Sequence, residues 1–172
     1  AITNPSQNLS NTPVETMESQ HPVRVEEYAL VPDSCGAGEY RGGLGVARSY
    51  RLLADEAGLQ LRADRMKIRP YGLAGGGEAE PAVNEITTRD GAQVSLPSKI
   101  NRKMDQGDLV RHVQPGGGGF GDPLQRDPQR VARDVWNTKI TADYAREHHR
   151  VVVDPATGVL DEASTAALRG EG

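Results

Sequence analysis

Glycine and proline constrain this chain more than any other residues, because they gather in three short segments. The chain has 20 glycines and 11 prolines among 172 residues, against a usual share of about 12% for the two together. The clusters lie at Gly36–Gly45, Gly72–Gly77 and Pro115–Gly121. Glycine serves where the backbone conformation or a close approach excludes a side chain. Because the excess is clustered and not spread, we expect three ordered loops and not a low-complexity sequence.

Segments with strand character lie before, between and after the first two clusters. The predicted strands span residues 22–30, 46–53, 59–68, 83–88, 93–96 and 109–113. In these segments apolar and polar residues alternate, or β-branched residues dominate. Asp55–Gly58 is predicted to form a hairpin connection, and Arg89–Gly91 is predicted to form a turn between two short strands.

After Gly121 the pattern changes to short helices. Asp127 followed by Pro128 is typical of a helix start, and Thr141 and Asp161 are predicted to cap two further helices. Strands followed by helices indicate an α+β fold, with a β-rich body and glycine-rich loops followed by short C-terminal helices. The predicted division is an extended polar lead-in over residues 1–13, a β-rich domain over 14–123, and a helical tail over 124–172 packed on it.

Composition excludes several classes of protein. The net charge is −4, with 20 Lys and Arg against 24 Asp and Glu, which argues against nucleic-acid binding through a basic field. A single cysteine, Cys35, excludes an internal disulfide and a multi-cysteine zinc site. The sequence has no apolar run long enough to predict a membrane-spanning helix. The first residues contain no basic region and no apolar segment, so we expect no secretory signal and a cytoplasmic location.

The third glycine cluster has two interpretations. The N–H groups of Gly116, Gly117, Gly118 and Gly119 could converge on an anion, or the bare glycines could let another backbone pack closely. We favour packing and keep the ligand alternative open. The chain lacks the Gly-Lys-Ser/Thr of a phosphate-binding P-loop.

The candidate cations also have two interpretations, anion binding and simple exposure to solvent. Arg65, Lys67 and Arg69 alternate on one predicted strand, so we expect them to share a face beside the second cluster, and Lys99 adds a further charge. Such a face could bind a phosphate or carboxylate, or could simply be solvated. The four histidines lack the spacing of a metal site, and Cys35 fits a small turn residue better than a nucleophile. The sequence predicts no catalytic residue in this chain.

Six segments together carry a family resemblance. They are Asn11–Glu18, Pro22–Val25, Asp33–Gly45, Leu96–Lys99, Pro115–Pro123 and Asp127–Val135. In this order they resemble the hydantoinase B/5-oxoprolinase family, from about Asn8 to Leu168. The resemblance is to the C-terminal portion of a B-type subunit. It implies an ATP-dependent cyclic amide hydrolase (a hydantoinase, oxoprolinase or lactamase) or, alternatively, a ketone carboxylase such as acetone or acetophenone carboxylase.

The resemblance also implies partners and cofactors. A hydantoinase A-type ATP-binding subunit phosphorylates the substrate, and the B-type subunit completes hydrolysis or carboxylation. The metal ligands belong to the N-terminal portion of the B-type subunit. We therefore expect no cofactor or metal in this chain, and ATP with Mg and a divalent metal on partner chains.

Three roles remain open for the chain itself. In the first, Gly116–Gly119 with Arg65, Lys67 and Lys99 help to form the site that binds the phosphorylated intermediate. In the second, the chain is a non-catalytic structural module for subunit assembly. In the third, it is a small-molecule binding module that acts alone.

Overall fold

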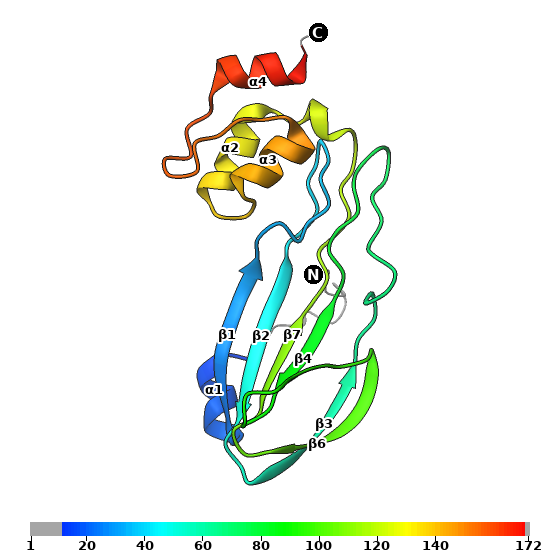
Figure 1. Ribbon diagram of the computed structural model, residues 1–172, viewed down its shortest axis with the longest axis vertical. Coiled ribbons are helices and arrows are strands. Elements are labelled where there is room, and N and C mark those ends of the chain that lie inside the picture. Colours follow the sequence, from blue (N-terminus) through cyan, green and yellow to red (C-terminus); the bar gives the residue numbers. More distant parts are fainter. Residues whose placement is uncertain (1–11, 171–172) are drawn as a thin grey trace. The chain divides into compact units, whose positions relative to one another are not determined.

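The fold combines two antiparallel sheets with short helices, which confirms the predicted α+β class (Figure 1). The computed structural model describes residues 12–170. Among these residues, no helix combines the length and apolar character that a membrane crossing requires. The elements are α1 (Val14–Gln20), β1 (Val23–Val31), β2 (Gly45–Leu52), β3 (Glu56–Arg62), β4 (Val83–Thr87), β5 (Gln93–Ser95), β6 (Lys99–Asp105), β7 (Leu109–Val113), the 3-10 helix η1 (Pro123–Gln125), α2 (Pro128–Trp136), α3 (Ala142–His149) and α4 (Glu162–Arg169).

The chain forms two compact units, each built from separated segments. Unit 1 comprises Ala1–Ala29, Val46–Met66 and Ala82–Gln114, and unit 2 comprises Leu30–Gly45, Lys67–Pro81 and Pro115–Gly172. This division differs from the predicted one at residues 14–123 and 124–172, because all three glycine clusters join the helices in unit 2. The predicted lead-in over residues 1–13 lies almost wholly outside the described residues.

Unit 1 is a five-stranded sheet covered by a two-stranded ribbon. The sheet order is β1-β2-β7-β4-β5, and β3 pairs with β6 in the ribbon. Figure 1 shows β1, β2, β7 and β4 side by side. Leu52, Ile86, Leu96, Met104 and Val110 form the buried core, and apolar residues of the ribbon pack against it. The period-two burial along the strands explains why alternation predicted most of them.

Several strand predictions are confirmed and some are wrong. β1, β2, β7 and the β4–β5 hairpin lie where they were expected. The predicted hairpin at Asp55–Gly58 is wrong, because β2 and β3 belong to different sheets. β6 was missed, because its inward side carries Arg102 between Ile100 and Met104 and so lacks a clean apolar alternation.

The predicted cationic strand face is also wrong. β3 ends at Arg62, which pairs with Lys99 at the start of β6. Pro97, two residues before Lys99, has no N–H with which to extend the pairing of the two strands. Arg65 then adopts a left-handed φ of 63°, so the chain bends where the prediction placed a continuous strand. Arg65, Lys67 and Arg69 therefore do not share a strand face.

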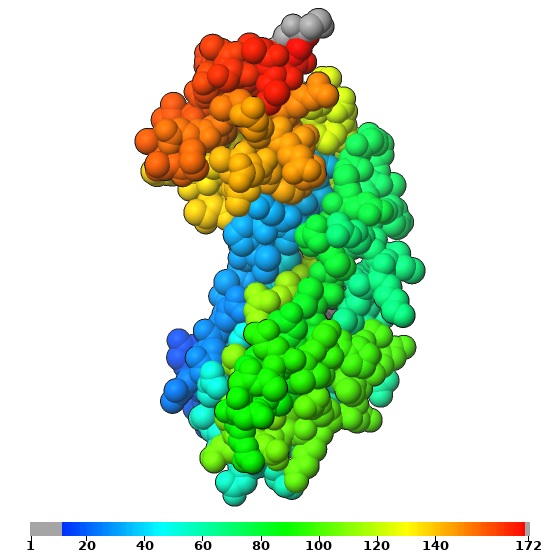
Figure 2. Space-filling view, in the orientation of Figure 1, coloured from blue at the N-terminus to red at the C-terminus, as the bar shows by residue number. Residues whose placement is uncertain are grey.

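The helices of unit 2 begin at the predicted caps. The Asp127 carboxylate accepts the Gln129 N–H at the start of α2, and Thr141 caps α3 while Asp161 caps α4. The helical part of unit 2, yellow to red in Figure 2, packs closely on itself. Its core joins Val131 and Val135 of α2 to Ala145 of α3, and includes Cys35 and Leu44 from the first glycine cluster. The helices and the glycine segments thus share one core.

Candidate functional site

Three extended glycine-rich segments of unit 2 lie side by side and form what we call the glycine bundle, residues 34–43, 71–77 and 116–121. The Gly36 N–H donates to the Gly117 carbonyl at 2.8 Å, and the Gly77 N–H donates to the Ala37 carbonyl at 2.7 Å. The Leu73 N–H donates to the Gly119 carbonyl at 2.9 Å. Backbone hydrogen bonds therefore connect each segment to the other two.

Eight glycines of this bundle are required by close approach to a neighbouring backbone and not by a positive φ. A Cβ on Gly118 would overlap the Tyr71 carbonyl, and a Cβ on Gly36 would overlap the Gly77 carbonyl. Neither residue has a positive φ, so other residues could adopt the same backbone angles. The same overlap with a neighbouring backbone occurs at Gly38, Gly42, Gly72, Gly76, Gly116 and Gly119. Only glycine lets three backbones approach this closely.

The glycines whose N–H groups were predicted to bind an anion, Gly116–Gly119, lie in the central segment of the bundle. The N–H groups of Gly116, Gly117 and Gly119 donate to the carbonyls of Glu80, Gly43 and Gly77, at 3.3, 2.8 and 3.0 Å. These three groups therefore already have backbone acceptors, as the packing interpretation expects. An anion-binding role for Gly116–Gly119 stays a prediction.

The predicted cations divide between the units. Arg65 and Lys99 belong to unit 1 and Lys67 belongs to unit 2, and all three side chains are exposed. Arg69, also exposed, forms an ion pair with Glu80 at 3.0 Å. The exposed positions of Arg65, Lys67 and Lys99 leave their binding role a prediction.

A buried ion cluster, which the sequence analysis missed, joins the glycine bundle to the helices. The Asp134 carboxylate on α2 accepts hydrogen bonds from Arg41 Nε at 2.9 Å and Arg126 at 2.8 Å. The Asp134 side chain is only 7% exposed. Burial alone would raise the pKa of Asp134, but the hydrogen bonds and charge of Arg41, together with Arg126, hold this pKa below its usual value.

One signal in the sequence could have located this cluster. Asp134 lies between Val131 and Val135 on the buried face of α2, where a carboxylate needs a cationic partner. The partner comes from the first glycine segment, because Arg41 lies there and also donates to the Gly42 carbonyl. The cluster is therefore a structural connection between segments that are far apart in the sequence.

Three other reactive side chains of unit 2 are buried or part-buried and occupied by structural contacts. Burial raises the pKa of the Cys35 thiol, which is 1% exposed, and keeps it protonated and unreactive. The Tyr144 hydroxyl donates to the Cys35 carbonyl at 2.7 Å. His149 is fully buried, and its Nδ1 lies 3.0 Å from the Pro123 carbonyl. Cys35 is thus a packed residue, as its sequence context indicated.

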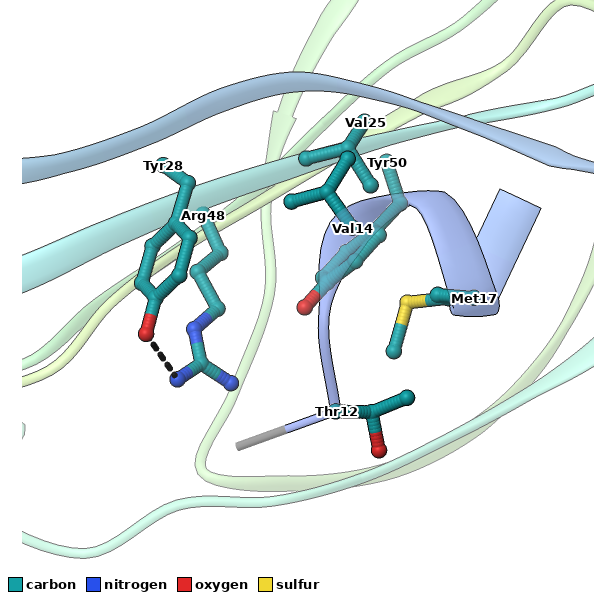
Figure 3. A pocket seen from close by; sticks show the side chains of 7 residues that line it. All are labelled: Thr12, Val14, Met17, Val25, Tyr28, Arg48 and Tyr50. Carbon is teal, nitrogen blue, oxygen red and sulfur yellow. Dashed lines mark hydrogen bonds between the residues drawn. The ribbon is translucent and has the colours of Figure 1, made fainter. Parts of the chain in front are cut away.

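Unit 1 contains a small cavity of about 210 Å³ between α1 and strands β1 and β2 (Figure 3). Its lining residues are Thr12, Val14, Met17, Val25, Tyr28, Arg48 and Tyr50. The Arg48 guanidinium lies 4.6 Å from the centre of the Tyr28 ring and donates to the Tyr28 hydroxyl at 3.2 Å. The cavity combines an apolar wall with the Arg48 cation and the phenols of Tyr28 and Tyr50.

The family follows from a comparison with known proteins. Residues 1–123 match the family model described as hydantoinase B/oxoprolinase, which includes all three segments of the glycine bundle. The chain belongs to the hydantoinase B/oxoprolinase family. This result confirms the resemblance found in the sequence.

Members of the hydantoinase B/oxoprolinase family with named activities align along most of this chain. A putative D-/L-hydantoinase B-type polypeptide of Pseudomonas sp. (strain NS671) is 34% identical over 94% of the chain. The structure of ATP-dependent caprolactamase from Pseudomonas jessenii is 32% identical over 91% of the chain, with a TM-score of 0.76. Nucleotide-free acetone carboxylase has a TM-score of 0.79 over 93% of the chain at 24% identity, and so shares its fold.

The chain spans little more than a quarter of the length of these relatives. It covers 27% of the hydantoinase polypeptide, 28% of the caprolactamase chain and 26% of the acetone carboxylase chain. Relatives in this family are subunits of ATP-dependent hydrolase or carboxylase complexes. Within residues 12–170, no three His, Cys, Asp or Glu side chains come together as a metal site would require. Within the described residues, the glycine bundle is the place where close backbone contact excludes side chains at eight positions.

We predict that Gly118→Ala lowers the free energy of unfolding by about 3 kcal/mol, because the new Cβ would collide with the Tyr71 carbonyl. Gly43→Ala is the matched control, since a Cβ there meets nothing within 4 Å and should change stability by no more than about 0.5 kcal/mol. Urea unfolding of both variants measures the difference. Equal stability of the two variants would show that close approach does not select glycine here.

We predict that His149 makes the protein less stable in mild acid. Burial is the main reason that the pKa of His149 lies below its usual value, so the unfolded chain binds a proton near pH 6.5 that the folded chain does not. Stability should therefore fall as the pH drops from about 7 to 5.5, by at most about 1.4 kcal/mol per pH unit. Urea unfolding at several pH values should show a shallower slope for His149→Gln than for the exposed control His21→Gln. Identical slopes would contradict this account.

Proposed function

We propose that this chain is a part of a hydantoinase B-type subunit in an ATP-dependent cyclic amide hydrolase. The observation that carries this proposal is the likeness to ATP-dependent caprolactamase, which extends over nearly the whole chain in both sequence and fold. The likeness to acetone carboxylase is below 25% identity and supports the fold alone. Ring opening of a cyclic amide is therefore the preferred reaction.

In this proposal the glycine bundle forms a rigid wall of the assembled enzyme. Its three segments are held by backbone hydrogen bonds and joined to α2 by the Asp134 cluster. A wall with fixed backbone positions loses little conformational entropy when substrate binds beside it. The reacting groups belong to other parts of the enzyme. An A-type partner binds ATP with Mg, and the N-terminal portion of the B-type subunit holds a divalent metal, in the cytoplasm where ATP is available.

The exposed cations supply positive charge for a phosphorylated intermediate. Arg65, Lys67 and Lys99 are free to approach an anion from solvent, since each side chain is exposed. Charge-assisted hydrogen bonds to a phosphate are about twice as strong as neutral ones. Binding of the intermediate through these side chains would complement an assembly whose other groups carry out hydrolysis.

The reaction is tested on the assembled enzyme, purified with its A-type and B-type polypeptides. We expect caprolactam or a hydantoin to be opened only when ATP is present, with release of phosphate. Carboxylation is the second candidate, since the acetophenone carboxylase delta subunit of Aromatoleum aromaticum is 27% identical over 90% of the chain. ATP-dependent carboxylation of a ketone such as acetone, without ring opening of any cyclic amide, would replace the proposed hydrolase with a carboxylase.

We predict that Lys67→Ala and Lys99→Ala each lower kcat/KM of the assembled enzyme by about tenfold or more, because each removes a positive charge near the intermediate. Lys103→Ala is the matched control, since Lys103 is also exposed but pairs with Glu56 across the β3–β6 ribbon at 2.5 Å. Steady-state kinetics with a saturating ATP concentration measures the effect. Normal turnover in both variants would remove Lys67 and Lys99 from the site.

That negative result would favour the second role, a structural module. In that case variants of the glycine bundle should impair assembly while the enzyme that still assembles keeps its normal turnover. Gly117→Ala suits this test, because its Cβ would lie 3.1 Å from the Gly43 nitrogen and the neighbour needs to move only slightly. Size-exclusion chromatography beside the activity assay separates the two roles.

A further inference from the structure

Most aromatic side chains of this chain face outward, although it has few of them. The sequence contains one Phe, one Trp and five Tyr, and five of these seven are 47% exposed or more. They are Tyr28, Tyr40, Tyr71, Phe120 and Trp136. Aromatic residues bury the largest apolar areas in cores and interfaces. Their exposure indicates that part of this surface is covered in the functional assembly.

Three exposed apolar side chains stand together on the glycine bundle, and we call them the aromatic face: Tyr40, Leu73 and Phe120. Phe120 lies in the central segment, paired with Tyr40 in an antiparallel bridge and with Leu73 in a parallel one. Directly bridged residues direct their side chains to the same side. The rings of Tyr40 and Phe120 have their centres 6.3 Å apart. The three side chains remain 55%, 58% and 52% exposed, in sequence order.

The backbone beneath the aromatic face is fixed. Tyr40 and Phe120 exchange two backbone hydrogen bonds, at 3.0 and 2.9 Å. The Leu73 carbonyl accepts the Gly121 N–H at 3.0 Å. The aromatic face is thus presented on a rigid support and not on a loose loop, so covering it requires little ordering of the chain.

The relatives indicate what covers it. This chain spans only 27% of the hydantoinase polypeptide and 28% of the caprolactamase beta chain that it matches, so most of a B-type polypeptide lies outside these residues. The family model matches residues 1–123 and therefore includes the whole aromatic face. A segment that belongs to a longer folded unit is expected to expose the apolar surface that the rest of that unit covers.

We propose that the aromatic face of Tyr40, Leu73 and Phe120 docks against the remainder of a hydantoinase B-type polypeptide, through an apolar surface on that remainder. A second copy of this chain is the competing occupant. The proposal depends on the family and not on the chemical reaction, so it holds for a hydrolase or a carboxylase alike.

Hydroxyl-radical footprinting with mass spectrometry tests the proposal on the assembled enzyme and on this chain alone. We expect oxidation of Tyr40 and Phe120 to fall at least fivefold in the assembled enzyme. Oxidation within twofold of that in the chain alone would overturn the proposal. Protection of both residues in the chain alone, together with a dimer in sedimentation velocity, would assign the face to a second copy and overturn it as well.

Variants give an independent measurement of the same surface. Tyr40→Ser and Phe120→Ser should each weaken binding to the B-type remainder at least tenfold, since each removes an aromatic side chain that docking would bury. Val159→Ser is the control, because Val159 is 63% exposed in the same unit but lies outside the face. Equal binding by all three variants would overturn the proposal. If a serine variant fails to fold, footprinting of the unmodified protein decides. Neither readout uses substrate, so a failure here is distinct from a failure of the proposed reaction.

Discussion

Close contact between bare backbones is the constraint on which unit 2 depends. Eight glycines, among them Gly36 and Gly118, lie where any side chain would overlap a neighbouring backbone. Hydrogen bonds between the three segments of the bundle then replace the contacts that side chains would otherwise make. This explains how a chain with few aromatic residues forms an ordered body. The interior at this point is built from peptide groups and not from large apolar side chains.

The bundle also accounts for the placement of charge and of apolar surface. Because glycine segments offer few side chains for attachment, Arg41 reaches from the first segment to the buried Asp134 of α2. A buried pair of this kind is costly to break, because one charge would be left without its partner. The few large side chains on the bundle, such as Phe120, point outward. They are therefore available for contact with another surface.

Local signals predicted much of the fold, while long-range contacts escaped the prediction. Asp127, Thr141 and Asp161 begin helices as expected, since capping depends on residues a few positions away. β6 was missed and the strand through Arg65 was predicted wrongly, because pairing between β3 and β6 decides where both strands end. The run of glycines at Gly116–Gly119 was enough to predict close backbone packing. It could not predict which segments pack there, since nothing in the sequence near Gly118 indicates that Tyr71 lies against it.

Amide hydrogen exchange of the bundle glycines, followed by NMR, tests the central claim most directly. If backbone packing holds unit 2 together, the N–H groups of Gly36, Gly77, Gly117 and Gly119 should exchange as slowly as the buried amides of α2. Their hydrogen bonds would then open only when the whole unit unfolds. Exchange at the rate of unprotected loop amides, while α2 stays protected, would contradict the account and show that the glycine segments are ordinary loops.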